Sequence, residues 1–119
     1  MTQFGKKSPY DVTAESWELS AHKDGQSRIV GGALDGVWFG DFVRQYGAKV
    51  CGWKSRTFDR FPILIKFIDA AKPLSVQIHP DDDYAFVHEK EFGKNEMWYV
   101  MDAAEGAYLY CGFSRQVSE

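Results

Sequence analysis

Three polar side chains, those of Ser75, Gln77 and His79, alternate with apolar residues in the stretch 74–80. In an extended strand, alternate residues point to opposite faces, so these groups form a row with about 7 Å between neighbours. A hydroxyl, a carboxamide and an imidazole are costly in a core unless they find partners. Amide oxygens and imidazoles are also groups that bind metal ions. The row predicts one wall of a site, and the aliphatic face of the same stretch predicts packing against a core.

A second distinctive stretch runs from Gly93 to Tyr99 and begins with two opposite charges. Lys94 and Glu96 are two residues apart at the start of a predicted strand, so both can face the same side. Taken alone, the two favour an ordinary surface ion pair, which stabilises a protein little. The apolar run 97–101 follows directly, however, and predicts burial. A carboxylate at the rim of a core needs a metal ion or a cation beside it.

Together, the two stretches supply one nitrogen and two oxygen donors, from His79, Gln77 and Glu96. Mixed nitrogen and oxygen ligands without thiolates suit an open, catalytic zinc site better than a closed, structural one. The spacing alone is a weak signal, because the sequence holds no short HxxxH or CxxC motif. His22 and His88 are ligands by type only, and a structural or solvated position is favoured for each.

The elements that must position these residues are mostly short strands. Lys23-Asp24-Gly25 is a turn signal between two extended runs and predicts a hairpin. A second turn is predicted around Glu105-Gly106. The extended stretches predicted from apolar alternation and β-branched or aromatic content are 17–22, 26–31, 62–69, 74–79, 95–102 and 107–113.

Two helical insertions are predicted between the strands. Apolar residues follow helical spacing from Trp38 to Tyr46, with Asp35 as the N-cap and Gly47 as the stop. A short helix opens at 80–83, with acidic residues in its first turn. The fold class is therefore mainly β and antiparallel, and 119 residues predict one domain, 1–119, with a modest core.

Composition excludes several classes of partner. A formal net charge of −3 argues against nonspecific nucleic-acid binding but permits an anionic small molecule. No apolar run approaches the length of a membrane span, and no signal peptide is recognisable, so no membrane partner is expected. Cys51 and Cys111 can pair, but without a secretion signal they favour free thiols in a reducing cytoplasm.

Four strings in the chain resemble type I mannose-6-phosphate isomerase (phosphomannose isomerase). They are ESWELSAH (15–22), FPILIKFIDA (61–70), LSVQIHPDD (74–82) and GKNEMWYVMDA (93–103). The strings follow the family's order and cover nearly the whole chain. The resemblance implies a cupin, or jelly-roll, fold and one zinc ion that serves to interconvert mannose 6-phosphate and fructose 6-phosphate.

The resemblance also implies roles for individual residues. Gln77, His79 and Glu96 match the metal ligands, and this set would leave a zinc ion with net positive charge. Ser75 and Lys94 match positions in the pocket for the phosphorylated hexose. Lys66 is a weaker candidate for the same pocket.

The implied reaction moves a proton from C2 to C1 of the sugar through an enediol. A zinc ion near O1 and O2 can stabilise the developing negative charge as a Lewis acid. Lys94 is the predicted catalytic side chain, holding the phosphate or an oxyanion as a point charge. The base that moves the proton has no assignment, and Glu96 is a poor candidate while it binds metal.

The chain departs from the family in length. The resemblance implies a further histidine ligand and an arginine downstream, and Glu119 is the last residue here. The expected jelly roll is therefore incomplete, with exposed apolar edges. A fragment, a sheet completed by dimerisation and a reduced relative all explain this, and a fragment that self-associates is favoured.

Functional hypotheses from three classes follow. The first is a sugar-phosphate isomerase, or its metal-bearing part. The second is a catalytically inactive cupin module that binds a sugar phosphate or mediates assembly. Oxygenation is less favoured, because the usual iron set of two histidines and one carboxylate is incomplete.

Overall fold

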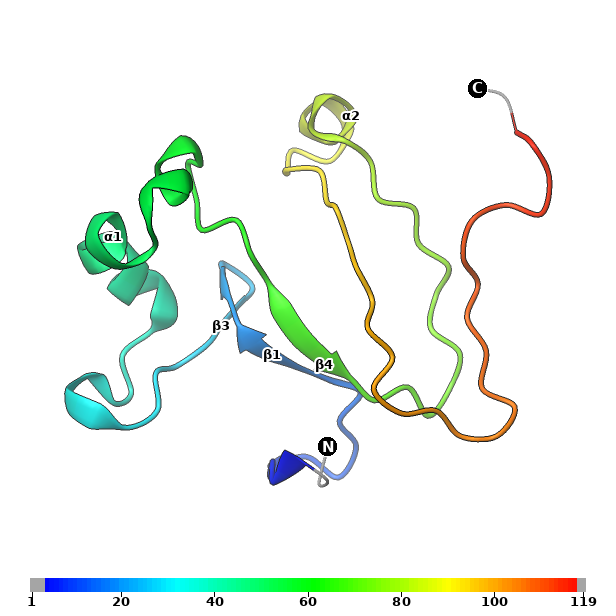
Figure 1. The fold of residues 1–119 in the computed structure, drawn as a ribbon, viewed down its shortest axis with the longest axis horizontal. Coiled ribbons are helices and arrows are strands. Elements are labelled where there is room, and N and C mark those ends of the chain that lie inside the picture. Colours follow the sequence, from blue (N-terminus) through cyan, green and yellow to red (C-terminus); the bar gives the residue numbers. More distant parts are fainter. Residues whose placement is uncertain (1–3, 118–119) are drawn as a thin grey trace. The chain divides into compact units, whose positions relative to one another are not determined.

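The first half of the chain is organised by an antiparallel pair of strands, β1 (Glu15–Leu19) and β4 (Ile65–Ile68) (Figure 1). The structure, a computed structural model, describes residues 4–117. Glu15 lies opposite Ile68 and Leu19 opposite Ile65, with a register shift after Trp17. The contacts divide the chain into two compact units, Met1–Pro73 and Leu74–Glu119, which we call unit 1 and unit 2.

A small hairpin in unit 1 confirms the predicted turn at 23–25. β2 (Ala21–His22) pairs antiparallel with β3 (Gly25–Gln26). The buried Ser20 closes the base of the hairpin: its hydroxyl donates to the Gly25 carbonyl and accepts from the His22 N–H. One side chain thus satisfies two backbone groups of the turn.

The predicted first helix is present, but its ends differ from the prediction. A 3₁₀ turn, η2 (Gly32–Leu34), precedes α1 (Phe39–Val50), and a second, η3 (Trp53–Thr57), follows it. Asp35 is not the N-cap, because its carboxylate accepts from the Gly31 N–H at 2.6 Å and so fixes the preceding loop. Gly47 is not the stop either. It is buried inside the helix, which continues to Val50.

The second helix, α2 (Asp82–His88) in unit 2, confirms the helix predicted to open at 80–83. Asp81 caps it by accepting from the Tyr84 N–H at 2.9 Å. The acids Asp82 and Asp83 lie in its first turn, where they complement the helix dipole.

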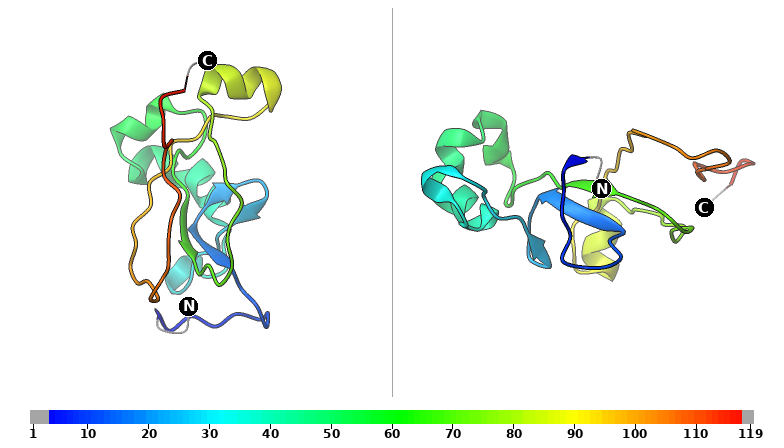
Figure 2. Two further views of the ribbon diagram at one scale, coloured as in Figure 1. Left: turned by 90° about the vertical axis from the view of Figure 1, so that its right-hand side faces the viewer. Right: turned by 90° about the horizontal axis from the view of Figure 1, so that it is seen from below.

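The three strands predicted in unit 2 are not strands in the structure. The stretches 74–79, 95–102 and 107–113 run without regular secondary structure (Figures 1 and 2). Within residues 4–117, no ladder of backbone hydrogen bonds joins them. An alternating sequence forms a strand only when a neighbouring chain takes up its N–H and C=O groups. The predicted turn is nevertheless present, closed by the Ala107 N–H on the Ala104 carbonyl at 3.0 Å.

The predicted apolar core is largely missing from the part of the chain that the structure describes, in which Ser20, Gly47 and Ala85 are the buried residues. The run 97–101, predicted to be buried, is open to solvent: Met97 is 88% and Tyr99 84% exposed. The aliphatic face of 74–80 is exposed as well. The described part of unit 2 contains no sheet, so no second layer of its own covers these side chains.

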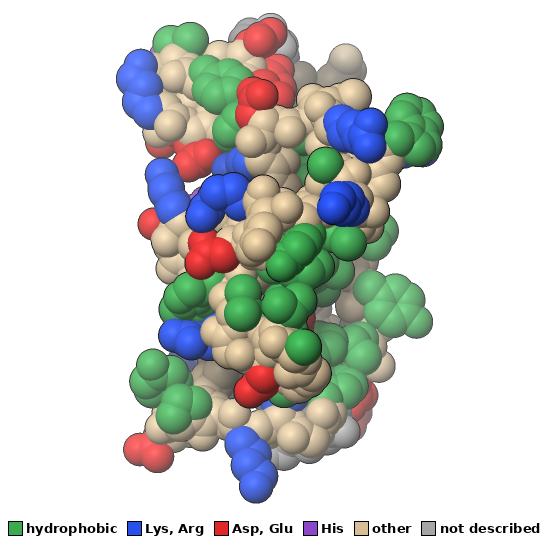
Figure 3. Space-filling view, turned by 90° about the vertical axis from the view of Figure 1, so that its left-hand side faces the viewer, with side chains coloured by type: hydrophobic (Ala, Val, Ile, Leu, Met, Phe, Trp, Pro, Cys, Tyr) green, Lys and Arg blue, Asp and Glu red, His purple; other side chains and the backbone are tan. Residues whose placement is uncertain are grey.

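Unit 1 also leaves large apolar side chains in solvent, such as Trp53 and Ile63. The face drawn in Figure 3 shows apolar side chains interspersed with charged ones. Two small antiparallel sheets and two α-helices agree with the predicted mainly antiparallel β class. The cupin jelly roll stays a prediction. Within residues 4–117, no helix is long and apolar enough to cross a membrane.

Candidate metal centre

A close approach of two backbone segments at the base of α2 positions the candidate site. The Lys94 N–H donates to the Pro80 carbonyl at 3.1 Å, and the Gly93 N–H donates to Oδ1 of Asp82 at 2.8 Å. A Cβ on Gly93 would lie 2.4 Å from the carbonyl carbon of Asp81. Only glycine permits this approach, and Figures 1 and 2 show that the segment after α2 turns back beside the segment that leads into it. We call this contact the α2 clasp.

The α2 clasp joins the residue that follows His79 to a residue just before Glu96, and their side chains meet. Nε2 of His79 lies 3.3 Å from Oε2 of Glu96, and both side chains are about three-quarters buried. Two neighbouring ligand atoms of a tetrahedral zinc ion lie about 3.3–3.4 Å apart, given zinc bonds of about 2.0–2.1 Å. The spacing of this nitrogen and oxygen therefore fits one edge of a zinc site.

Lys94 holds the other oxygen of the same carboxylate. Its Nζ lies 2.6 Å from Oε1 of Glu96. Hydrogen bonds from Lys94 and then Trp98 lower the pKa of Glu96 to about 2; partial burial opposes this shift, and the Lys94 charge and a contact with His79 add to it. Glu96 is therefore an anion across the physiological range, the form in which a carboxylate binds a metal ion.

Trp98 is a member of the cluster that the sequence reasoning missed. Its indole N–H donates to Oε2 of Glu96 at 2.9 Å. The spacing of the two residues could have predicted this contact, because residues two apart, such as Glu96 and Trp98, share one face of an extended chain. The prediction that 97–101 is buried placed this tryptophan in a core and so concealed its polar contact.

Ser75 and Gln77 form a second polar contact in unit 2. Nε2 of Gln77 donates to Oγ of Ser75 at 3.0 Å. The amide oxygen of Gln77, which is the atom a metal ion would take, lies outside this bond. The structure thus pairs the two residues that the sequence placed in one row.

Among residues 4–117, no group of three or more histidine, cysteine, aspartate and glutamate side chains is gathered to hold a metal ion. His79 and Glu96 supply two ligands of types that suit zinc, and a third depends on the amide of Gln77. The remaining histidines make other contacts. His88 stacks on Tyr84 with 4.2 Å between ring centroids, and His22 lies 3.6 Å from Asp24.

Lys66, the weaker pocket candidate, belongs to unit 1. It lies on β4, and its Nζ is 3.1 Å from Oε2 of Glu15 on the neighbouring strand β1. This cross-strand ion pair gives Lys66 a role in unit 1 whether or not it also contacts a substrate.

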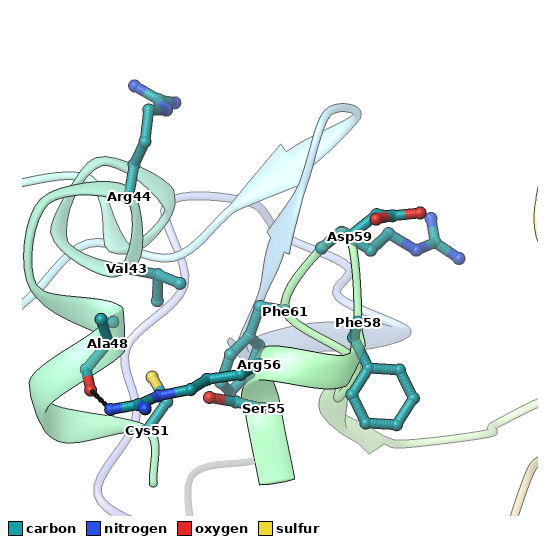
Figure 4. Close-up of a pocket in the computed structure, with 11 residues that line it drawn as sticks. Val43, Arg44, Ala48, Cys51, Ser55, Arg56, Phe58, Asp59 and Phe61 are labelled. Carbon is teal, nitrogen blue, oxygen red and sulfur yellow. Dashed lines mark hydrogen bonds between the residues drawn. The ribbon is translucent and has the colours of Figure 1, made fainter. Parts of the chain in front are cut away.

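A cavity of about 280 Å³ lies in unit 1, between α1, η3 and the segment that follows η3 (Figure 4). Val43, Cys51 and Phe61 line it, and Nη2 of Arg56 donates to the Ala48 carbonyl at its edge. None of the six predicted site residues, all within the described range 4–117, lines this cavity. Four charged side chains, those of Arg44, Arg56, Asp59 and Arg60, also line it.

Comparisons with known proteins identify the family. Residues 1–108 match the family described as phosphomannose isomerase type I, catalytic domain. The mannose-6-phosphate isomerase of Streptococcus mutans is 39% identical over 117 residues, which are 98% of this chain and 36% of that protein. ManA of Bacillus subtilis, a mannose-6-phosphate isomerase, is 36% identical over 120 residues, or 100% of this chain and 37% of that protein.

More distant relatives agree. The mannose-6-phosphate isomerase of Escherichia coli is 34% identical over 110 residues, which are 88% of this chain and 27% of that protein. No solved structure matches the chain. The chain spans about a third of the length of the first two relatives. On the match to the catalytic domain over residues 1–108, the chain belongs to the phosphomannose isomerase type I family.

Proposed function

We propose that the chain carries part of a zinc-dependent site that interconverts mannose 6-phosphate and fructose 6-phosphate. The observation that carries the proposal is the contact of Nε2 of His79 with Oε2 of Glu96 at 3.3 Å, beside the Lys94 ammonium. These are three of the residues for which the sequence predicts metal-binding and substrate-binding roles. The names of the relatives support the sugar phosphate as substrate.

Zinc, when bound, supplies a Lewis acid that stabilises negative charge on the sugar oxygens. The residues of the chain have complementary tasks. His79 and Glu96 offer one nitrogen and one anionic oxygen, and Gln77 offers a neutral amide oxygen, so the set carries a single negative charge. A divalent ion held by these groups keeps a net positive charge.

Lys94 is suited to a second task at the same site. An ammonium group has three N–H donors, and one of them is directed to Oε1 of Glu96. The side chain is 38% exposed, so its other donors are accessible to a ligand. We propose that they bind an oxygen of the phosphorylated hexose, either on the phosphate or on the carbon chain.

A coupled assay of fructose 6-phosphate formation from mannose 6-phosphate tests this function. We expect turnover that chelation abolishes and zinc restores, and that Lys94→Ala lowers at least 10-fold, as for loss of one charged donor. Lys90→Ala is the matched control, because Lys90 contacts the Val87 carbonyl on α2. The absence of zinc binding by the purified chain would contradict the proposed site, and the absence of zinc-dependent turnover would contradict catalysis by this chain alone.

A second candidate function, an assembly module without catalysis, has its own supporting observation. Unit 2 exposes apolar side chains on all three of its extended stretches, including Val76 at 80%, Met97 at 88% and Tyr110 at 80%. Monomeric soluble proteins rarely expose large contiguous apolar areas. We propose that a second copy of the chain covers them, and sedimentation velocity distinguishes a dimer from a monomer.

We further propose that the chain works in the cytoplasm. Cys51 and Cys111 are both free thiols in the structure. Free thiols are typical of reducing compartments. Localisation of a tagged chain by cell fractionation tests this proposal.

A further inference from the structure

We propose that Trp98 is a positioning residue of the metal centre, which fixes the Glu96 carboxylate so that it binds a divalent cation through Oε2 alone. The inference rests on the proposed zinc site and adds a residue to it. Three groups contact this one carboxylate, and they are not distributed evenly. Lys94 takes Oε1, whereas the Trp98 indole and the His79 imidazole both meet Oε2.

The carboxylate has little intrinsic preference for one orientation. The terminal torsion of a glutamate side chain is broad and two-fold, so its two oxygens exchange places readily without partners. A strong ammonium contact on Oε1 and an indole contact on Oε2 hold the plane of the group from both ends. Fixing the plane in advance lowers the entropic cost of binding.

The same arrangement determines how many oxygens can bind the cation. Oε1 is engaged by a charged donor at 2.6 Å, which competes with a cation for its lone pairs. Oε2 has a neutral donor at 2.9 Å and lies beside Nε2 of His79. An oxygen has more than one lone pair, so Oε2 can keep the indole bond and also bind the ion. The expected mode is therefore monodentate.

Trp98 is suited to a positioning role because its donor is neutral and its ring is only partly covered. The side chain is 47% exposed, so it contributes little to packing for its size. An indole is a donor only and cannot itself bind the ion. Outer-shell partners of this kind typically change metal affinity 10–100-fold when removed.

Zinc affinity of the 119-residue chain, measured by competition with a chromophoric chelator near neutral pH, tests the proposal. Trp98→Phe removes the N–H and keeps an aromatic ring. We expect it to weaken zinc binding 10–100-fold. Trp53→Phe is the control, because Trp53 lies on η3 in unit 1 and is 72% exposed, and we expect unchanged affinity.

A spectroscopic measurement on the unaltered chain separates positioning from packing and does not depend on a variant that folds. The NMR spectrum of the chain with ¹⁵N-labelled indoles is compared before and after zinc is added. Zinc should shift the Nε1–H resonance of Trp98 and leave that of Trp53 in place. An unmoved Trp98 resonance overturns the proposal even if Trp98→Phe binds zinc weakly, because the loss then comes from packing.

The two proposals fail in different ways. If the unaltered chain binds zinc and Trp98→Phe binds it equally well, the positioning role is overturned and the zinc site stands. If the unaltered chain binds no zinc, the zinc site is overturned and the role of Trp98 falls with it.

Discussion

Nζ of Lys94 lies 2.6 Å from Oε1 of Glu96, which makes a predicted substrate-binding residue the direct partner of a predicted metal ligand. The sequence placed the two on one face of an extended chain but left open whether they form an ordinary surface pair. The additional contacts of Glu96 with Trp98 and His79 separate it from such a pair. The carboxylate is the centre of the cluster, and its other members are arranged around it.

Removing the Lys94 charge should raise the pKa of Glu96. The pKa is lowered from 4.5 to about 2, with the Lys94 hydrogen bond as the largest cause. In Lys94→Gln without metal, we expect it to move part of the way back towards 4.5, because the charge of Lys94 is lost while the Trp98 hydrogen bond remains. An NMR titration of the carboxyl carbon measures this. Lys90→Gln should leave the pKa near 2. A carboxyl that still titrates near 2 in Lys94→Gln contradicts the assignment of cause.

The same pair makes stability depend on pH. A carboxylate whose folded-state pKa is depressed stabilises the fold above its unfolded pKa, here about 4.5, and loses that effect as pH falls towards 2. Lys94→Gln should therefore lower the free energy of unfolding at neutral pH by no more than about 1 kcal/mol, because both side chains are partly exposed. The difference from the unaltered chain should vanish at about pH 2.

Loss of the His79 imidazole should abolish most zinc binding. His79→Ala removes the nitrogen that lies beside Oε2 of Glu96, and we expect zinc content after dialysis to fall to background. The control is His88→Ala, because His88 lies on α2 and stacks on Tyr84 instead. Metal analysis by mass spectrometry measures both variants, and equal zinc in His79→Ala and the unaltered chain rejects the ligand assignment.

A methyl group on Gly93 should open the α2 clasp. Its Cβ would lie 2.4–2.7 Å from three backbone atoms of residues 80–82, which no rotamer change can relieve. We expect Gly93→Ala to lower the free energy of unfolding by about 2 kcal/mol or more, and to separate His79 from Glu96. Gly106→Ala, at φ 79° with open space around it, should cost only about 1 kcal/mol of backbone strain. Urea unfolding compares them.

Replacing the buried Ser20 should loosen the β2–β3 hairpin. Ser20→Ala leaves the Gly25 carbonyl and the His22 N–H without their side-chain partner. We expect a loss of about 1 kcal/mol in the free energy of unfolding, the usual net contribution of a hydrogen bond, because these groups are only partly buried. Ser114→Ala, at an exposed position, is the control and should change little. Equal stability of the two variants would show that solvent replaces the lost bonds.

Local features of the fold were predictable, because they depend on residues close in sequence. The turn at 23–25 and the acidic first turn of α2 follow from turn and helix-end chemistry that a few neighbouring residues determine. The ends of α1 were predicted wrongly for a related reason. Asp35 had two local bonding options, and it takes the loop N–H of Gly31 rather than a helix end.

Features that require a second layer could not be predicted from the pattern alone. The alternation in 74–79 and the apolar run 97–101 predict which side chains are buried. They do not predict which segment, of this chain or of another, packs against them. In the structure, both stretches are exposed, and within residues 4–117 neither forms a ladder of backbone hydrogen bonds. The polar face depends less on that cover, because Ser75 with Gln77, and His79 with Glu96, meet through contacts within unit 2.

The α2 clasp has a consequence for how this region tolerates change. His79 and Glu96 are 17 positions apart along the chain, yet the backbone between them is pinned at both ends by Lys94 on Pro80 and Gly93 on Asp82. The distance between His79 and Glu96 therefore depends on the α2 clasp and not on the number of residues between them. We therefore expect that changes in the length of α2 which keep residues 80–82 and 93–94 intact leave the contact between His79 and Glu96 in place.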